Sequence, residues 1–260
     1  MREEKVEFYS EGQKVIGILH IPDVENPPAI IIVHGYGGYI FTDRFKHIAS
    51  DFCKVGYATL RFAFRGFDSE TGDKSTKEFK NLTISGEISD LKAAIDFMYS
   101  KGYRKIGLAS ESLGGTIIIL LNDTRVKALA FWSANIHVKA TFENLYGDKM
   151  IKEIEEKGRA IYTSHTTGNK FEIGKKFWDE VKKIEDISER KIKAIKCPIL
   201  IIHGANDRYF GVKVAKDLYK IANKPKKLLI IEGANHTFVE LECRQQLIDA
   251  ILDWFKRYLD

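Results

Sequence analysis

The chain has 260 residues, of which 44% are hydrophobic, 12% aromatic and 30% charged. This length suits one large domain or two small ones, and so much apolar material excludes a disordered or fibrous protein. Lysine and arginine number 41 against 36 acidic residues, a net charge of +5. Because the two signs are interspersed, the charge pattern predicts no nucleic-acid partner and no anionic membrane surface.

The sequence also predicts no membrane span, no signal peptide and no disulfide framework. No apolar run approaches the roughly 18 residues that a transmembrane helix needs. The first five residues mix both charges and lead into no apolar segment, which favours a cytoplasmic location. The 3 cysteines, Cys53, Cys197 and Cys243, are widely spaced without a Cys-x-x-Cys pair, so a thiolate metal site is not expected either.

The first elements along the chain are predicted to be a β-hairpin and a buried strand. Residues 6–9 and 15–21 have strand patterns, and the segment Glu11-Gly12-Gln13 between them is a turn signal of hairpin length. Ala29–Val33 is a short, wholly apolar run rich in β-branched residues. Such a run is typical of a strand that is buried on both faces of a parallel sheet.

From there, helix and strand periods alternate. The sequence predicts helices over residues 42–54, 83–100, 212–221 and 244–258, and another that starts near Thr116. It predicts further strands over residues 57–62, 105–109, 126–132, 198–203 and 227–232. Such alternation with short connections predicts an α/β fold, in which helices flank both faces of a mostly parallel central sheet.

The alternation breaks once, over about residues 134–193, where charged helical sequence is interleaved with aromatic residues. We expect one domain over residues 1–260 that carries a small helical insertion at this break. An ordinary amphipathic surface element fits the same pattern. A segment inserted beside the ends of the strands nevertheless favours a cap over a binding site.

A serine stands at the predicted turn between the strand over 105–109 and the next helix. The segment reads Ser110-Glu111-Ser112-Leu113-Gly114-Gly115, and a serine in a strand–turn–helix context indicates a nucleophile elbow. In such a tight turn, the residues two before and two after the nucleophile must be small. Ser112 meets this requirement, whereas Ser110 has Leu108 two residues before it. Ser112 is therefore the predicted nucleophile, although Ser110 stands where the G-x-S-x-G pattern has its first glycine.

A serine nucleophile needs a general base and a carboxylate that orients the base. Among the 7 histidines, His236 lies in a loop directly after the last predicted strand, at the carboxyl edge where parallel sheets place ligand sites. Asp207 follows the preceding strand, although taken alone it reads as a turn or helix-capping aspartate. Ser112, Asp207 and His236 follow each other in the chain order of an α/β-hydrolase triad, and we predict them as the catalytic residues.

The glycine-rich segment His34-Gly35-Tyr36-Gly37-Gly38 follows the first buried strand. Its glycines allow the backbone to turn an N–H group toward an oxyanion. We expect the N–H groups of Tyr36 and Leu113 to form the oxyanion hole. A phosphate cradle is the alternative, but the segment lacks both the P-loop ending and the spacing of a dinucleotide motif. No cofactor and no metal ion are predicted.

Through these segments, together with His203-Gly204-Ala205-Asn206-Asp207 and Gly233-Ala234-Asn235-His236-Thr237-Phe238, the chain resembles the α/β-hydrolases over nearly its whole length. It is similar to compact serine esterases of the cinnamoyl or feruloyl esterase and monoacylglycerol lipase kind. The resemblance implies a Ser-Asp-His triad, no cofactor, and an insert after the sixth strand that shapes the acyl or alcohol pocket. The chain departs from these relatives at Ala63, where an aspartate is common.

These features predict a carboxylesterase for small-molecule esters with aromatic or medium-length acyl groups. We expect six aromatic residues to contact the substrate: Tyr39, Phe41, Phe142, Tyr146, Trp178 and Phe238. The alternative for the rings of the insertion is that they only hold it onto the main domain. A thioesterase or a small amidase or peptidase uses the same catalytic groups, and a ligand-binding receptor with low turnover can retain them.

Overall fold

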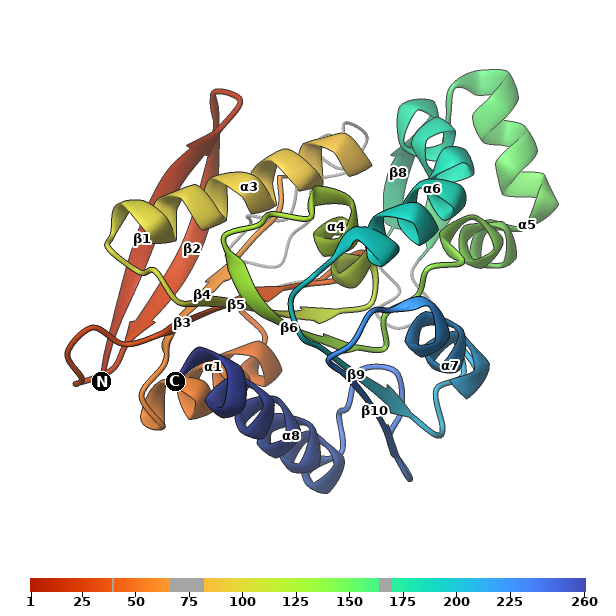
Figure 1. The fold of residues 1–260 in the computed structure, drawn as a ribbon. Helices are drawn as coiled ribbons and strands as arrows, with labels where there is room; N and C mark the ends of the chain where they lie inside the picture. The colour runs from red at the N-terminus through yellow and green to blue at the C-terminus, as the bar shows by residue number, and fades with distance from the viewer. Residues whose placement is uncertain (39, 66–81, 164–169) are drawn as a thin grey trace.

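A mixed sheet of eight strands lies at the centre of the computed structural model, which describes residues 1–38, 40–65, 82–163 and 170–260 (Figure 1). In spatial order the strands are β1 (Arg2–Ser10), β2 (Gln13–Ile21), β4 (Ala58–Phe62), β3 (Ala29–Val33), β5 (Ile106–Glu111), β6 (Val126–Trp132), β9 (Ile199–Gly204) and β10 (Lys226–Ile231). β2 is antiparallel to both β1 and β4, and the pairs from β4 to β10 are parallel. The predicted hairpin and the mostly parallel sheet are confirmed.

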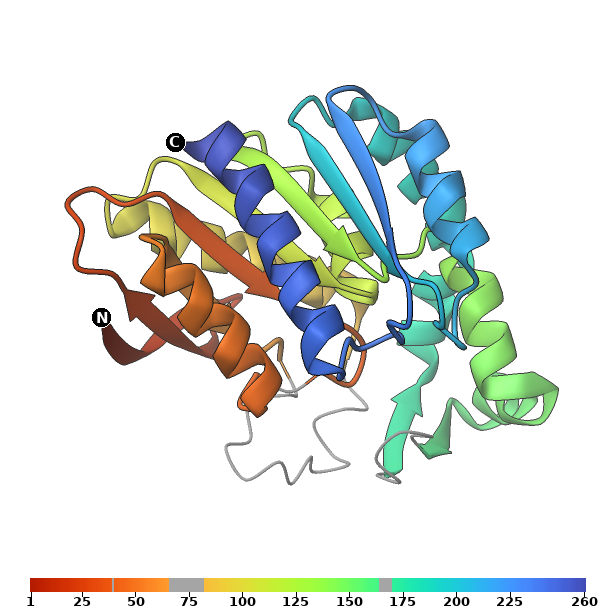
Figure 2. The ribbon, with the colours of Figure 1, turned by 90° about the horizontal axis from the view of Figure 1, so that it is seen from below.

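Helices cover both faces of this sheet (Figures 1 and 2). One face carries α3 (Ile84–Ser100), α4 (Leu113–Leu121), α6 (Lys175–Ala194) and α7 (Val212–Ile221), and the other carries α1 (Asp43–Lys54) and α8 (Leu241–Leu259). Strand side chains alternate between the two faces: Ile31 and Val33 belong to the first layer, and Ile30 and Ile32 to the second. This period of two explains why β3, covered on both sides, is apolar throughout.

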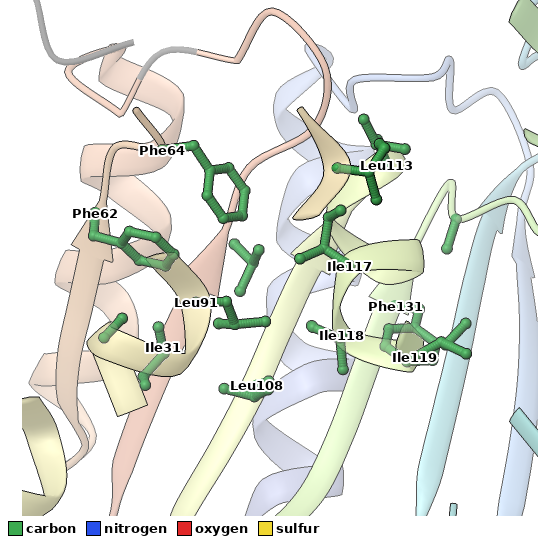
Figure 3. Close-up of a cluster of buried hydrophobic side chains, with 14 of the residues drawn as sticks. Ile31, Phe62, Phe64, Leu91, Leu108, Leu113, Ile117, Ile118, Ile119 and Phe131 are labelled. Carbon is green, nitrogen blue, oxygen red and sulfur yellow. The ribbon is translucent and has the colours of Figure 1, made fainter. Parts of the chain in front are cut away.

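The larger core layer lies between the sheet and helices α3 and α4 (Figure 3). Leu91 of α3 and Ile117 and Ile118 of α4 belong to the same buried cluster as Ile31 and Leu108 of the sheet. Burying one such aliphatic side chain contributes about 1.5–3 kcal/mol. This packing holds α4 against β5 and thereby fixes the position of the turn between them.

Two threonines set the beginnings of predicted helices. The Thr42 side chain accepts a hydrogen bond from the N–H of Phe45 in α1, and the Thr83 side chain accepts one from the N–H of Gly86 in α3. These caps satisfy N–H groups that have no partner in a first helical turn. No helix within the described ranges is long and apolar enough to cross a lipid bilayer.

The insertion, defined here as the segment between β6 and β9, contains more than helices. Its two helices, α5 (Val138–Lys157) and α6, are joined by an antiparallel hairpin of β7 (Arg159–Thr163) and β8 (Lys170–Gly174). The hairpin differs from the purely helical insertion that the sequence pattern predicts. In β7 only Ala160 and Tyr162 are buried, so the strand alternation spans too few residues to stand out from the charged helical sequence around it.

Candidate active site

Ser112 stands in the turn between β5 and α4. Its backbone has φ 50° and ψ −121°, a left-handed conformation that is strained for a residue with a side chain. Its N–H donates a 3.0 Å hydrogen bond to the carbonyl of Trp132 at the end of β6. A Cβ atom at Gly114 would lie 2.7 Å from the carbonyl oxygen of His34, so the turn needs a glycine there. These are the local features expected of a nucleophile elbow.

Ser110, the other serine of the motif, is fully buried within β5. Its hydroxyl has no hydrogen-bond partner in the part of the chain that the structure describes. A side chain without accessible surface cannot attack a substrate. The position two residues before Ser112 therefore calls for a small side chain and not for a nucleophile.

Asp207 and His236 are joined by a hydrogen bond at the carboxyl edge of the sheet. His236 Nδ1 donates to Asp207 Oδ2 at 2.7 Å, since a carboxylate can only accept. The neutral imidazole then carries its proton on Nδ1, which leaves Nε2 able to accept a proton. The two residues follow β9 and β10, which are neighbouring parallel strands.

The second carboxylate oxygen of Asp207 organises its own loop. Oδ1 accepts hydrogen bonds from the N–H groups of Tyr209 at 2.9 Å and Phe210 at 3.0 Å. Burial by itself raises the pKa of Asp207, but the hydrogen bonds from His236 and from these N–H groups outweigh it and lower the pKa below its ordinary value. Asp207 is thus a carboxylate at neutral pH and can hold the His236 ring.

Ser133 connects the two sides of the site. Its Oγ donates a 2.7 Å hydrogen bond to the main-chain carbonyl of His236. The residue before it, Trp132, accepts from the N–H of Ser112. The end of β6 therefore contacts both the turn with Ser112 and the loop with His236. Sequence reasoning missed Ser133, although a small polar residue directly after an apolar strand was the available signal.

Two aromatic rings flank His236. The ring centroids of Tyr209 and Phe210 lie 5.2 Å and 4.9 Å from that of the imidazole, at interplanar angles of 61° and 79°. Such edge-on contacts favour one orientation of the ring. Tyr209 is 46% exposed, so its ring borders the solvent side of the site. These neighbours were also missed, even though they follow Asp207 by two and three positions.

The loop after β3 packs against the turn that carries Ser112. A Cβ atom at Gly35 would lie 2.9 Å from Ser112 Cβ and 3.6 Å from the Leu113 nitrogen. Only glycine allows so close an approach. Tyr36 is the next residue, so the two predicted oxyanion donors belong to segments in direct contact. The nitrogen of Leu113 also opens helix α4, where N–H groups favour negative charge.

The structure contradicts one of the predicted substrate contacts, Phe238. Its side chain has no exposed surface and belongs to the core layer under α1 and α8, away from the insertion. Its backbone has a left-handed φ of 53°, which the sequence pattern did not show. Proximity to His236 in the sequence therefore did not mean proximity of the side chain to the substrate.

The structure packs three other predicted contact residues inside the insertion. Phe142, Tyr146 and Trp178 are buried, and Phe142 and Tyr146 contact the ring of Tyr36 or its hydroxyl. Trp178 Nε1 donates to Glu155 within the insertion. These contacts favour the alternative in which the rings hold the insertion in place. Of the remaining two, Phe41 is half-buried against the core, and Tyr39 lies outside the described residues.

A metal site would need several ligating side chains together. Within the described ranges, no group of three or more His, Cys, Asp or Glu residues is placed to hold a metal ion.

The chain is similar to known proteins in family, sequence and fold. The model of the prolyl oligopeptidase family matches residues 43–260. The acylamino-acid-releasing enzyme of Rattus norvegicus is 22% identical over 245 residues, which cover 92% of this chain and 32% of that enzyme. The esterase domain of a Rhodothermus marinus protein has a TM-score of 0.77 at 22% identity, over 100% of both chains. Est1E from Butyrivibrio proteoclasticus, with ferulic acid bound, has a TM-score of 0.78 at 21% identity, over 96% of this chain and 99% of its own. These structures confirm the predicted α/β-hydrolase fold.

Proposed function

Because the chain belongs to the prolyl oligopeptidase family and is a hydrolase of the esterase type, we propose that Ser112, His236 and Asp207 form its catalytic triad. The observation that carries this proposal is the 2.7 Å hydrogen bond from His236 Nδ1 to Asp207 Oδ2. It leaves Nε2 of His236 as the base, at the edge of the sheet where a strained turn presents Ser112.

In the proposed reaction, Ser112 Oγ attacks the ester carbonyl carbon while its proton passes to Nε2 of His236. The carbonyl electron pair moves onto oxygen, and the N–H groups of Tyr36 and Leu113 stabilise the resulting oxyanion. When the intermediate collapses, the alcohol leaves with the proton from His236 and the acyl group stays on Ser112. Water then attacks the acyl-enzyme with His236 as base, and the carboxylic acid is released.

We infer that the substrate is a small-molecule ester with an aromatic or medium-length acyl group. Tyr209 and Phe210 support this inference, because they bring apolar surface to the solvent side of His236. The likeness to Est1E, which was solved with the aromatic ferulic acid, supports it as well. We place the apolar wall of the site at these two rings, since Trp178 and Phe238 are buried elsewhere.

A fluorophosphonate probe tests the nucleophile. We expect labelling at Ser112 in the wild type and no labelling or ester hydrolysis in Ser112→Ala. Ser110→Ala is the matched control, two residues away, and should keep both. Labelling at Ser110, or ester hydrolysis that survives Ser112→Ala, would contradict the assignment. A panel of p-nitrophenyl esters from acetate to octanoate, with methyl ferulate, then tests the acyl group.

Cleavage of amide or peptide bonds is the second candidate. Membership of the prolyl oligopeptidase family and the similarity to the acylamino-acid-releasing enzyme favour it. The same three residues would act, with His236 delivering its proton to an amine. Matched p-nitrophenyl ester, p-nitroanilide and thioester substrates with one acyl group separate the candidates. An esterase has its highest kcat/KM on the ester, whereas a peptidase hydrolyses the anilide comparably well.

A further inference from the structure

A largely buried ion pair joins the first turn of α1 to the turn that carries Ser112. Arg44 Nη1 donates to Glu111 Oε1 at 2.6 Å, and Arg44 Nη2 donates to Glu111 Oε2 at 3.0 Å. The two side chains are only 15% and 6% exposed. Two parallel N–H···O bonds are the bidentate geometry in which arginine binds a carboxylate most strongly.

The position of this pair connects it to the proposed chemistry. Glu111 is the last residue of β5 and directly precedes Ser112. Its carbonyl oxygen lies 3.1 Å from where a Cβ atom of Gly35 would stand, so it also contacts the loop that carries Tyr36. Arg44 lies in the first turn of α1, at the far end of the same loop. The pair thus bridges the two segments that supply the proposed oxyanion donors.

The charge of Glu111 needs compensation. During ester cleavage a negative charge develops on the oxygen bound next to Ser112, and a nearby carboxylate raises the free energy of that state. Water screens Glu111 poorly because the side chain is buried. Arg44 supplies the opposite charge from inside the protein. Its guanidinium lies 4.4 Å from the centroid of the Phe45 ring, which helps to hold it in place.

We propose that Arg44 is a positioning residue that acts through Glu111: it cancels the carboxylate charge beside Ser112, so that this charge does not oppose the developing oxyanion. This inference rests on the proposed triad. A pair that served stability alone would lower the amount of folded protein but leave kcat unchanged in the folded fraction. A pair that serves the reaction lowers kcat when Arg44 is lost, and kcat recovers when Glu111 also loses its charge.

The decisive experiment compares Arg44→Gln, Glu111→Gln and the double variant on one p-nitrophenyl ester. We expect Arg44→Gln to lower kcat about 30-fold, with KM changed less than about threefold, as one uncompensated charge predicts. Glu111→Gln should stay within about threefold of the wild type, and the double variant should regain most of the lost kcat. The inference is overturned if Arg44→Gln keeps wild-type kcat or if the double variant is no better than Arg44→Gln.

Arg125 offers a matched control. It forms a similar two-pronged pair with Asp123, with distances of 2.9 Å from Nε to Oδ1 and 2.6 Å from Nη2 to Oδ2. This pair lies beside the start of β6, at the opposite end of the strand from Trp132. Arg125→Gln should lower the thermal unfolding temperature without lowering kcat. An equal loss of kcat in Arg125→Gln and Arg44→Gln would show a general effect of lost ion pairs and overturn the inference.

Two further measurements apply: one serves if Arg44→Gln does not fold, and the other tests the role of Arg44 separately from the triad. If Arg44→Gln does not fold, Arg44→Lys retains the charge and should keep kcat within about fivefold, and a loss as severe as in Ser112→Ala would overturn the charge argument. Fluorophosphonate labelling separates this inference from its premise. An unlabelled Ser112 in the wild type refutes the triad itself. Equal labelling rates of the wild type and Arg44→Gln refute only the role of Arg44, for which slower labelling is expected.

Discussion

The hydroxyl groups of Tyr36 and Tyr146 lie 2.8 Å apart and share a hydrogen bond, although 110 positions separate the two residues in sequence. Tyr36 belongs to the loop after β3, and Tyr146 belongs to α5 of the insertion. The ring of Tyr36 also stands edge-on to Phe142 and stacks on Phe177 at 5.5 Å. Burial raises the pKa of both hydroxyls, so both remain protonated donors. The insertion therefore holds the side chain of the residue whose N–H is the proposed oxyanion donor.

Tyr146→Phe removes one hydroxyl from this contact and leaves the ring. The free energy of unfolding should fall by about 1–2 kcal/mol, the usual cost of losing one partner of a buried hydrogen bond. We also expect kcat to fall a few-fold while KM stays constant, because the loop with Tyr36 is held less firmly. Denaturant unfolding and steady-state kinetics measure the two effects. Tyr9→Phe, on the exposed surface of β1, is the control and should change neither.

Asp207→Asn tests the carboxylate of the proposed triad. An amide cannot stabilise the imidazolium and does not enforce the Nδ1–H form of His236, so kcat should fall about 10³–10⁴-fold. Asp217→Asn is the matched control, because Asp217 Oδ2 lies 3.4 Å from His137 Nε2 in a pair outside the proposed site. Ester hydrolysis measures both. Equal activity of the two variants would contradict the role of Asp207.

Glu87 predicts a pH dependence of stability. The side chain is buried in α3, and burial, followed by the charge of Asp90, raises its pKa well above the ordinary value. A raised pKa means that the contribution to stability is fully present below the unfolded pKa of about 4.3 and is lost as pH rises through the folded pKa. Glu87→Gln removes this loss and should therefore stabilise the protein at pH 8 by about 1 kcal/mol or more.

Urea unfolding at several pH values between 4 and 8 measures this effect. The stability difference between Glu87→Gln and the wild type should shrink toward zero as pH falls to 4. Glu153→Gln, at an exposed carboxylate of α5, should show no such trend. A difference that does not change with pH would show that Glu87 acts by packing and not by titration.

Tyr209→Ala tests the proposed apolar wall. Removing this ring beside His236 should lower kcat/KM for the octanoyl ester about tenfold more than for the acetyl ester, as lost apolar contact predicts. Trp178→Phe is the control, since Trp178 is buried in the insertion and should leave the ratio between acyl chains unchanged. If Trp178→Phe shifts the kcat/KM ratio between the two esters and Tyr209→Ala does not, the insertion forms the acyl pocket instead.

Much of the fold could be predicted because its causes are local. The apolar run of β3, the starts of the helices near residues 42 and 83, and the small residues around Ser112 each depend on neighbours within a few positions. The same holds for the candidate residues Asp207 and His236, because a parallel sheet brings the residues that follow its strands to one edge.

Only the tertiary structure decided which distant groups meet. Phe238 has a left-handed φ and its ring lies in the core, and the period of a helix or strand carries no information about such a turn. The Arg44–Glu111 ion pair and the Tyr36–Tyr146 hydrogen bond join segments 67 and 110 positions apart. Their geometry depends on how α1 and the insertion pack on the sheet, which is set by the summed burial of many side chains and not by the residues next to either partner.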